Sequence, residues 1–154
     1  MIQAKSAQRQ LFQLIVGSLL ILLLFTLSGC STISEHDTKT LSDTHKISEK
    51  ITTLLISLEE LNKQAPDCLY ENFKDDYKAI KVGLNTLSLR EKAKLQNADT
   101  IKMVGNLNSS IGKLIDLHRS GCLSTGEATL LQKQFNSLIG SILTLENAKP
   151  QPLF

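Results

Sequence analysis

Four stretches of this chain carry apolar residues at alternating spacings of three and four, and this periodicity constrains the fold more than any other feature. Such spacing places apolar side chains on one face of an α-helix and polar side chains on the other. The pattern predicts four helices, over about 44–64, from about 67 to a point between 87 and 98, about 99–120, and about 124–148. The expected core positions are Ile47, Ile51, Leu54, Leu55, Leu58, Leu61, Leu69, Phe73, Tyr77, Ile80, Leu84, Leu87, Ile101, Val104, Leu107, Ile111, Leu114, Ile115, Ala128, Leu131, Phe135, Leu138, Ile142 and Leu145.

Local signals set the expected ends of these helices. Ser42 or Asp43 can cap the first helix, and Pro66 ends it, because proline disfavours helical geometry in the residue before it. Gly121 is expected to adopt the left-handed conformation past the end of the third helix. The Ser-Thr-Gly-Glu segment at 124–127 matches a capping box that starts the fourth helix.

Residues 88–98 are polar and weakly periodic, and two interpretations stay open there. The Ser-Leu-Arg-Glu segment at 88–91 can be a capping box that opens a short separate helix. Alternatively, the second helix continues through it. The sequence does not distinguish helix from loop in this segment.

Four helices of about 20 residues with short connections predict an all-α fold, an antiparallel four-helix up-down bundle. Cys68 opens the second helix and Cys122 directly precedes the fourth, so an up-down order places both at the same end of the bundle. We therefore expect a Cys68–Cys122 disulfide, which in the loop-closure model stabilises the fold by roughly 4 kcal/mol. Two buried free thiols are the alternative.

The amino-terminal segment carries Lys5 and Arg9, no acid, and then an uncharged apolar run from Leu14 to Leu27. A membrane-spanning helix needs about 20 apolar residues, so this run fits a secretory signal better. The run closes on Leu-Ser-Gly-Cys at 27–30, which resembles the lipobox of bacterial lipoproteins. An uncleaved signal anchor with an incidental cysteine is the alternative.

The resemblance implies that Leu27, Ser28 and Gly29 form the processing site and that residues 1–29 are a signal peptide that is removed. Cys30 then becomes the first residue, carries a diacylglycerol and receives a further acyl chain such as palmitate. Two or more chains anchor a protein stably, whereas one chain holds it only marginally. Ser31 in place of Asp after the cysteine implies the outer membrane, with the protein facing the periplasm.

The expected domain organisation follows from these features. Residues 30–43 are polar and read as the lipidated cysteine with a tether that can extend to about 40 Å. Residues 44–148 form the helical domain, and residues 149–154 form a mobile tail that ends in an apolar Leu-Phe pair.

Composition and motifs exclude several classes of function. Without Lys5 and Arg9 the chain has 15 basic and 15 acidic residues, a balance that disfavours nucleic-acid binding. The histidines, His36, His45 and His118, lack the spacing of a metal site and are expected to be solvated. No nucleophile motif is present, and neighbouring carboxylates diverge on a helix, so we expect no catalytic residue, no enzyme activity, no metal and no cofactor.

Gly105 and Gly112 lie seven residues apart on one face of the third helix. Glycine inside a helix costs up to about 1 kcal/mol relative to alanine, so these positions call for an explanation. They can allow close packing within the bundle, or they can form a shallow groove for a partner.

Two functional hypotheses remain. The first is a lipid-anchored, non-enzymatic envelope protein that acts as a scaffold or accessory subunit through contacts with an envelope protein. The second is a binding or inhibitory module that captures a diffusible ligand or an envelope-directed toxin.

Overall fold

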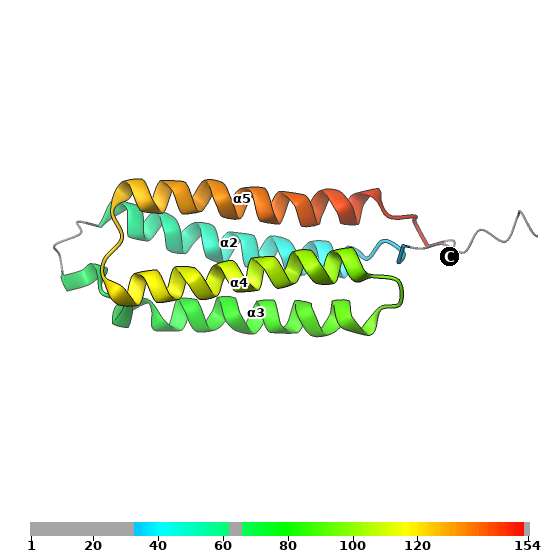
Figure 1. The fold of residues 1–154 in the computed structure, drawn as a ribbon, viewed down its shortest axis with the longest axis horizontal. Coiled ribbons are helices and arrows are strands. Elements are labelled where there is room, and N and C mark those ends of the chain that lie inside the picture. The colour runs from blue at the N-terminus through cyan, green and yellow to red at the C-terminus, as the bar shows by residue number, and fades with distance from the viewer. Residues whose placement is uncertain (1–32, 62–65, 153–154) are drawn as a thin grey trace, which may run out of the picture. The chain divides into compact units, whose positions relative to one another are not determined.

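The structure, a computed structural model, describes residues 33–61 and 66–152. These residues form four α-helices, α2 (Thr38–Glu60), α3 (Lys74–Ala93), α4 (Ala98–Ser120) and α5 (Thr125–Ala148), as Figure 1 shows. Two short 3-10 helices, η1 (Pro66–Cys68) and η2 (Tyr70–Phe73), precede α3. No helix within these two ranges has the length and apolarity needed to cross a membrane. The apolar run at 14–27 and the segment at 27–30 lie outside the described residues.

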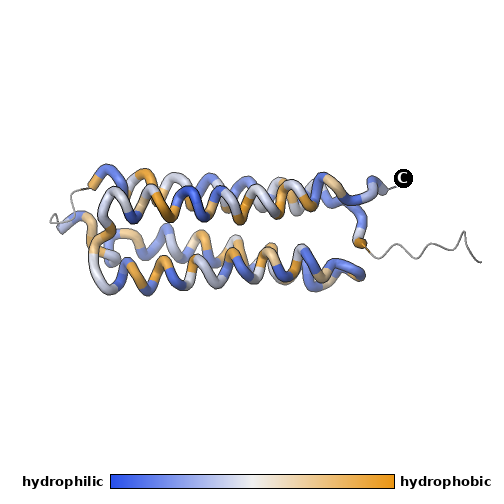
Figure 2. Tube along the Cα trace, turned by 45° about the horizontal axis from the view of Figure 1, so that its top comes forward, coloured by the Kyte–Doolittle hydropathy of each residue, from blue (hydrophilic) through white to orange (hydrophobic). Residues whose placement is uncertain are grey.

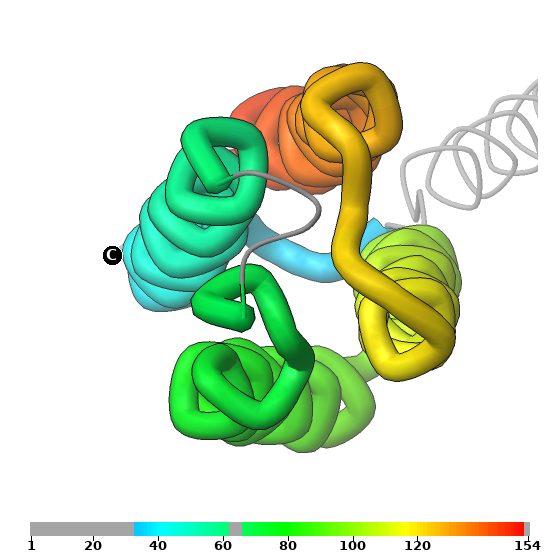
Figure 3. The backbone as a smooth tube through the Cα atoms, turned by 90° about the vertical axis from the view of Figure 1, so that its left-hand side faces the viewer, coloured from blue at the N-terminus to red at the C-terminus, as the bar shows by residue number. Residues whose placement is uncertain are grey.

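The four α-helices run up and down in turn and form an antiparallel bundle, as the sequence predicts. Each helix packs against its neighbour in the chain, and α5 closes the bundle by packing against α2. In the view along the bundle axis, α2 lies diagonally opposite α4, and α3 lies diagonally opposite α5 (Figure 3). Each helix therefore has two helical neighbours and keeps an outer face.

The core lies along the bundle axis and consists of the periodic apolar residues. Ile80, Leu84, Leu107 and Ile142 are fully buried, and apolar positions recur along all four helices in Figure 2. Burial of each such side chain contributes roughly 1.5–3 kcal/mol before the cost of ordering the chain. Most of the predicted core is confirmed, with half-buried edge positions at Leu61, Ile101, Leu131, Leu138 and Leu145.

The start of α5 confirms the predicted capping box. The Ser124 backbone N–H donates to Glu127 Oε2 at 2.7 Å, and the Glu127 backbone N–H donates to Ser124 Oγ at 3.3 Å. The two residues thus satisfy two backbone donors that the helix itself leaves without acceptors.

The predicted tether at 30–43 extends too far, because residues 38–43 belong to α2, and Ser42 and Asp43 are not caps. α2 begins six residues earlier than predicted, at Thr38, and the Asp37 carboxylate accepts from the Lys39 backbone N–H at 2.8 Å. Thr40 and Thr44 are buried and extend the stripe of Ile47 toward the amino terminus. Threonine hydroxyls make this turn look polar in sequence, although both residues are buried and the Thr40 hydroxyl donates to the buried Glu91 carboxylate.

The second helix also differs from the prediction at its start. The chain from Pro66 to Phe73 forms the two 3-10 turns, so α3 begins at Lys74 rather than near Asp67. Leu69 is half exposed and is not a core residue.

The connection between α3 and α4 resolves the segment at 88–98. α3 continues to Ala93, so the separate short helix is wrong, and Gln96 turns the chain with a left-handed φ of 55°. At the other end of α4, Gly121 has φ 161° and ψ 169°. This is extended backbone, and the expected left-handed glycine is also wrong.

The predicted mobile tail starts too early. Lys149 is buried, and the Pro150 carbonyl accepts from the His36 backbone N–H at 2.9 Å. Residues 151 and 152 are exposed, and the Leu-Phe pair at 153–154 lies outside the described residues.

Candidate functional site

The disulfide pole is the end of the bundle where α3 begins and α4 gives way to α5. Cys68 and Cys122 form a disulfide there, with their Cα atoms 5.5 Å apart and a sequence separation of 54. The predicted pairing is confirmed. The bond ties the turn before α3 to the connection between α4 and α5.

A buried hydrogen-bonded chain stands directly beside the disulfide. His118 Nε2 lies 2.7 Å from the Cys68 carbonyl oxygen, and His118 Nδ1 lies 2.8 Å from the Tyr77 hydroxyl. A carbonyl oxygen only accepts, so Nε2 carries the proton and, in the neutral ring, Nδ1 accepts from Tyr77. Burial, followed by Tyr70 and Asp76, raises the pKa of Tyr77, which keeps this hydroxyl a donor. The expectation that His118 is solvated is therefore wrong.

Aromatic rings cover the same place from outside. Tyr70 stacks on Tyr77 with ring centroids 5.5 Å apart, and the Arg119 guanidinium lies 4.8 Å above the Tyr70 ring. Phe73 packs against His118 at 5.5 Å. His118 is thus enclosed by rings and fully hydrogen-bonded, which favours a structural role over proton transfer.

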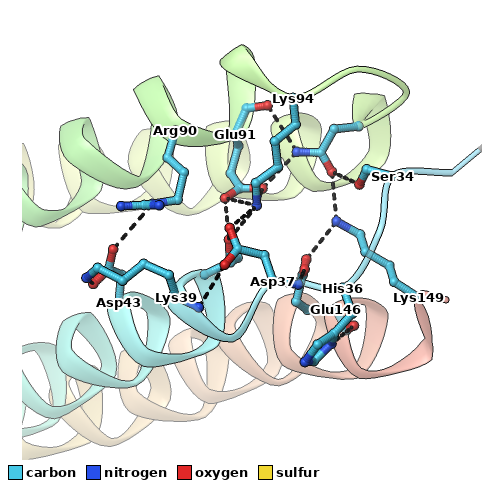
Figure 4. A network of polar contacts seen from close by, with 12 residues as sticks. Ser34, His36, Asp37, Lys39, Asp43, Arg90, Glu91, Lys94, Glu146 and Lys149 are labelled. Carbon is cyan, nitrogen blue, oxygen red and sulfur yellow. Dashed lines mark hydrogen bonds and ion pairs between the residues drawn. The ribbon is translucent and has the colours of Figure 1, made fainter. Parts of the chain in front are cut away.

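The opposite end, the polar pole, contains a network of buried charges (Figure 4). At its centre, the fully buried Glu91 carboxylate accepts from Thr40 Oγ1 at 2.6 Å and from Asn97 Nδ2 at 2.7 Å. Lys94 Nζ lies 2.9 Å and 3.0 Å from the two Glu91 oxygens and 2.7 Å from Asp37 Oδ2. These contacts join the start of α2 to the end of α3.

The second half of the network joins the end of α5 to the start of α2 and to the α3–α4 connection. Lys149 Nζ lies 2.7 Å from Glu146 Oε2 and donates to Asn97 Oδ1 at 2.8 Å. Glu146 Oε1 accepts from the Asp37 backbone N–H at 2.8 Å, and Ser34 Oγ donates to Asn97 Oδ1 at 2.9 Å. All four helix ends at this pole are therefore connected through polar contacts.

Opposite charges in the network keep Asp37 and Lys94 ionised. Partial burial alone would raise the pKa of Asp37, but hydrogen bonds from Lys94 and from the Lys39 backbone outweigh it and lower this pKa to about 2. Burial would lower the pKa of Lys94, and hydrogen bonds to Asp37 and Glu91 raise it instead. Both groups are charged at neutral pH.

The charged groups of the polar pole are paired with one another inside the domain. His36 Nδ1 donates to the Glu146 carbonyl at 2.9 Å, so His36 is half-buried rather than solvated, whereas His45 is exposed. Within residues 33–61 and 66–152, no three His, Cys, Asp or Glu side chains converge as metal ligands. The arrangement of these groups suits a structural clamp.

A groove of about 770 Å³ runs between α3 and α4. Its cationic side chains are Lys74, Lys78, Lys81, Lys92 and Arg119. Asp116 is the one acidic residue among those that the structure places along it. The groove is therefore strongly basic, although residues 30–154 carry equal numbers of basic and acidic side chains.

Gly105 and Gly112, for which the sequence leaves close packing and a partner groove as alternatives, lie on the outer face of α4. Gly112 lines the groove, and Gly105 lies two turns earlier on the same face. A Cβ atom at either position would meet no atom within 4 Å among the described residues, so they do not serve close packing. Close packing occurs instead at Gly83, where a Cβ atom would lie 3.1 Å from Ile47 Cγ1.

Only part of these sites is recognisable in the amino-acid sequence. Leu27, Ser28, Gly29 and Cys30 lie outside the described residues, and the disulfide is placed as predicted. The network around Glu91 and Glu146 is missed, although a signal exists. Glu91 follows Leu87 by four residues and Glu146 follows Ile142 by four, so both carboxylates are in phase with the core stripe.

Comparison with protein families, curated proteins and solved structures gives no match.

Proposed function

We propose that this protein is a lipid-anchored protein of a bacterial cell envelope, without enzymatic activity, which acts as a scaffold or accessory subunit through protein contacts. The observation that carries this proposal is the Leu-Ser-Gly-Cys segment at 27–30, after a basic flank and an uncharged apolar run. Ser31 favours the outer membrane and a periplasm-facing domain.

The short connection between Cys30 and the bundle supports an orientation. Ser34 is buried, and its backbone N–H donates to the Gln96 carbonyl at 2.9 Å at the polar pole. Four residues of extended chain from Cys30 to Ser34 reach about 14 Å at most. A lipid on Cys30 would thus hold the polar pole close to the membrane. In that orientation Leu95, which is 87 % exposed at the α3–α4 turn of this pole, would face the lipid interface.

The internal pairing of the buried titratable groups supports a non-enzymatic role. Catalysis needs an acid, base or nucleophile that a substrate can reach. In the described part of the chain, Glu91, Glu146 and His118 are buried and occupied by internal hydrogen bonds or ion pairs. They stabilise the bundle rather than offer a reactive group.

The lipid anchor is tested by metabolic labelling with an alkyne analogue of palmitate and by mass spectrometry of the mature amino terminus. We expect a lipidated Cys30 at the amino terminus and loss of labelling in Cys30→Ala. Cys68→Ser, which removes a thiol elsewhere, is the control and should keep the label. An intact Met1, or an unmodified sulfur at position 30, contradicts the proposal.

The basic groove favours a second candidate, in which the domain captures a diffusible protein or peptide with an acidic surface. The two functions differ in what is recovered with the full chain from detergent-solubilised envelope. A stable envelope assembly supports the scaffold, whereas a soluble ligand without an assembly supports the capture module.

A further inference from the structure

The groove between α3 and α4 combines charge, apolar contact area and an open floor. Three of its lysines, Lys78, Lys81 and Lys92, have no ion pair with any described residue. Lys74, by contrast, pairs with Glu71, and Arg119 lies 3.7 Å from Asp116. The three lysines therefore present positive charge that the described part of the domain does not neutralise.

Two exposed apolar side chains accompany these lysines on α3. Val82 is 59 % exposed and lines the groove, and Leu89 is 62 % exposed and lies seven residues later, two turns along the same face. Exposure of these two apolar side chains to water does not stabilise the domain. A partner helix that carries apolar residues every seven positions would cover both. Single exposed apolar residues are common, so the argument requires the charges beside them.

The floor of the groove allows a backbone to approach α4. Gly112 has open space where a side chain would stand. Asn108 and Ile115, one turn away on either side, line the same groove. Small residues at this position permit a second helix to lie near the α4 backbone.

We propose that this groove docks an acidic amphipathic helix of a partner protein. The helix lies along α3 and α4, packs apolar side chains on Val82 and Leu89, and places carboxylates against Lys78, Lys81 and Lys92. These lysines span about 20 Å at 1.5 Å per residue, the length of a helix of about 14 residues. The proposal rests on the proposed role as an interaction protein and names the chemistry of its partner.

Charge and geometry favour a protein helix over other anionic partners. A small anion needs converging donors in a closed site, and the groove is long and open. A bilayer would have to meet the side of the bundle, whereas a lipid on Cys30 would place the polar pole at the membrane. Nucleic acid would not use the apolar pair.

The test places a photo-crosslinking residue at Asn85, in the groove, within the full chain in its own envelope. The cross-linked peptide is sequenced by mass spectrometry, and a cross-linker at exposed Lys133 on α5 is the control position. We expect a segment with helical apolar spacing and carboxylates on its polar face. No product above that of the Lys133 position, or attachment to lipid, nucleic acid or a basic segment, overturns the proposal.

Charge reversal supplies the matched variant. The triple variant Lys78→Glu, Lys81→Glu and Lys92→Glu should reduce cross-linking about tenfold or more, because like charges then face the partner. Reversal of three exposed lysines on other faces, Lys46→Glu, Lys102→Glu and Lys133→Glu, should change it less than about twofold. Equal effects of the two triples contradict the docking site. Circular dichroism checks that both variants remain folded.

Failure of the lipid anchor gives a different result. If Cys30 is not lipidated, Cys30→Ala leaves both the membrane fraction and the cross-link unchanged. If the groove has no partner, palmitate labelling persists and the Asn85 cross-link is absent. The two proposals are therefore tested separately.

Discussion

Replacement of Glu91 by alanine tests whether the polar pole holds the bundle together. Its carboxylate is fully buried and accepts from Thr40, Asn97 and Lys94 at 2.6–3.0 Å. Loss of one partner of a buried ion pair costs about 3–5 kcal/mol. Lys94 keeps Asp37 at 2.7 Å and is a fifth exposed, so the lower end of that range applies.

A loss of about 3 kcal/mol corresponds to a marked drop in thermal stability. At roughly 2.1 cal/mol/K per residue, unfolding of about 120 residues has an entropy near 250 cal/mol/K, and the Tm should fall by about 12 °C. Glu91→Gln keeps the shape and part of the hydrogen bonding, so it should cost about half as much. Chemical denaturation and calorimetry measure both effects.

The matched control is Glu49→Ala, an exposed glutamate of α2, which should change stability by less than about 0.5 kcal/mol. In a double-mutant cycle, Glu91→Ala and Lys94→Ala should show a coupling energy of about 1–3 kcal/mol. A Glu91→Ala variant as stable as Glu49→Ala, or a coupling near zero, refutes the structural role assigned to this network.

The other predictions concern the disulfide, the pH dependence and the glycines. Cys68→Ser should lower stability by about 4 kcal/mol under oxidising conditions, and wild type in reductant should match it; equal melting with and without reductant contradicts this. Asp37→Asn keeps the helix cap but removes the charge. Because the pKa of Asp37 is lowered to about 2 in the folded state, the charge should stabilise the fold by about 1–2 kcal/mol above pH 4, and this stabilisation should be lost as the pH falls toward 2. A difference in stability from wild type that does not depend on pH would be inconsistent with the ion pair. Gly112→Ala should raise the free energy of unfolding by up to about 1 kcal/mol, since the new Cβ atom meets open space. Gly83→Ala should raise it less, because Ile47 must move to make room. A larger increase for Gly83→Ala would show that α2 and α3 approach less closely there.

The bundle could be predicted from sequence because one physical signal dominates it. Apolar residues in phase with the helical repeat must be buried together, and short connections force neighbouring helices to run antiparallel. The disulfide followed from the same topology, since Cys68 and Cys122 occupy helix ends at one pole only in an up-down order. These predictions depend on averages over many residues and tolerate errors at single positions.

The helix ends were harder because a few polar residues decide them. Thr40 and Thr44 are buried at the start of α2, yet their hydroxyls make the segment resemble a solvated tether. The 3-10 turns before α3 depend on the disulfide and on Asn72, whose side chain donates to the carbonyls of Pro66 and Asp67. Such contacts are local in space but are not periodic in sequence.

The polar pole could not be found from composition because charged residues usually indicate solvated faces. The informative signal was the position of two glutamates in the helical repeat. Glu91 and Glu146 continue the apolar stripes of α3 and α5 and would point into the core. An up-down topology places the end of α3 and the end of α5 at one pole, so two buried carboxylates there require nearby cations. Lys94 and Lys149 each follow their carboxylate by three residues and satisfy this requirement.

The location of this network gives it a role that the apolar core cannot fill. Buried ion pairs add little net stability relative to apolar residues, but they fix which helix ends meet. In this bundle they also hold the segment before α2, where Ser34 and His36 bond to the loop after α3 and to the chain after α5. If a lipid holds Cys30, a mechanical force between the membrane and the domain would act on this segment. The network would distribute that force over α2, α4 and α5 together, whereas a free tether would transmit it to the first turn of α2 alone.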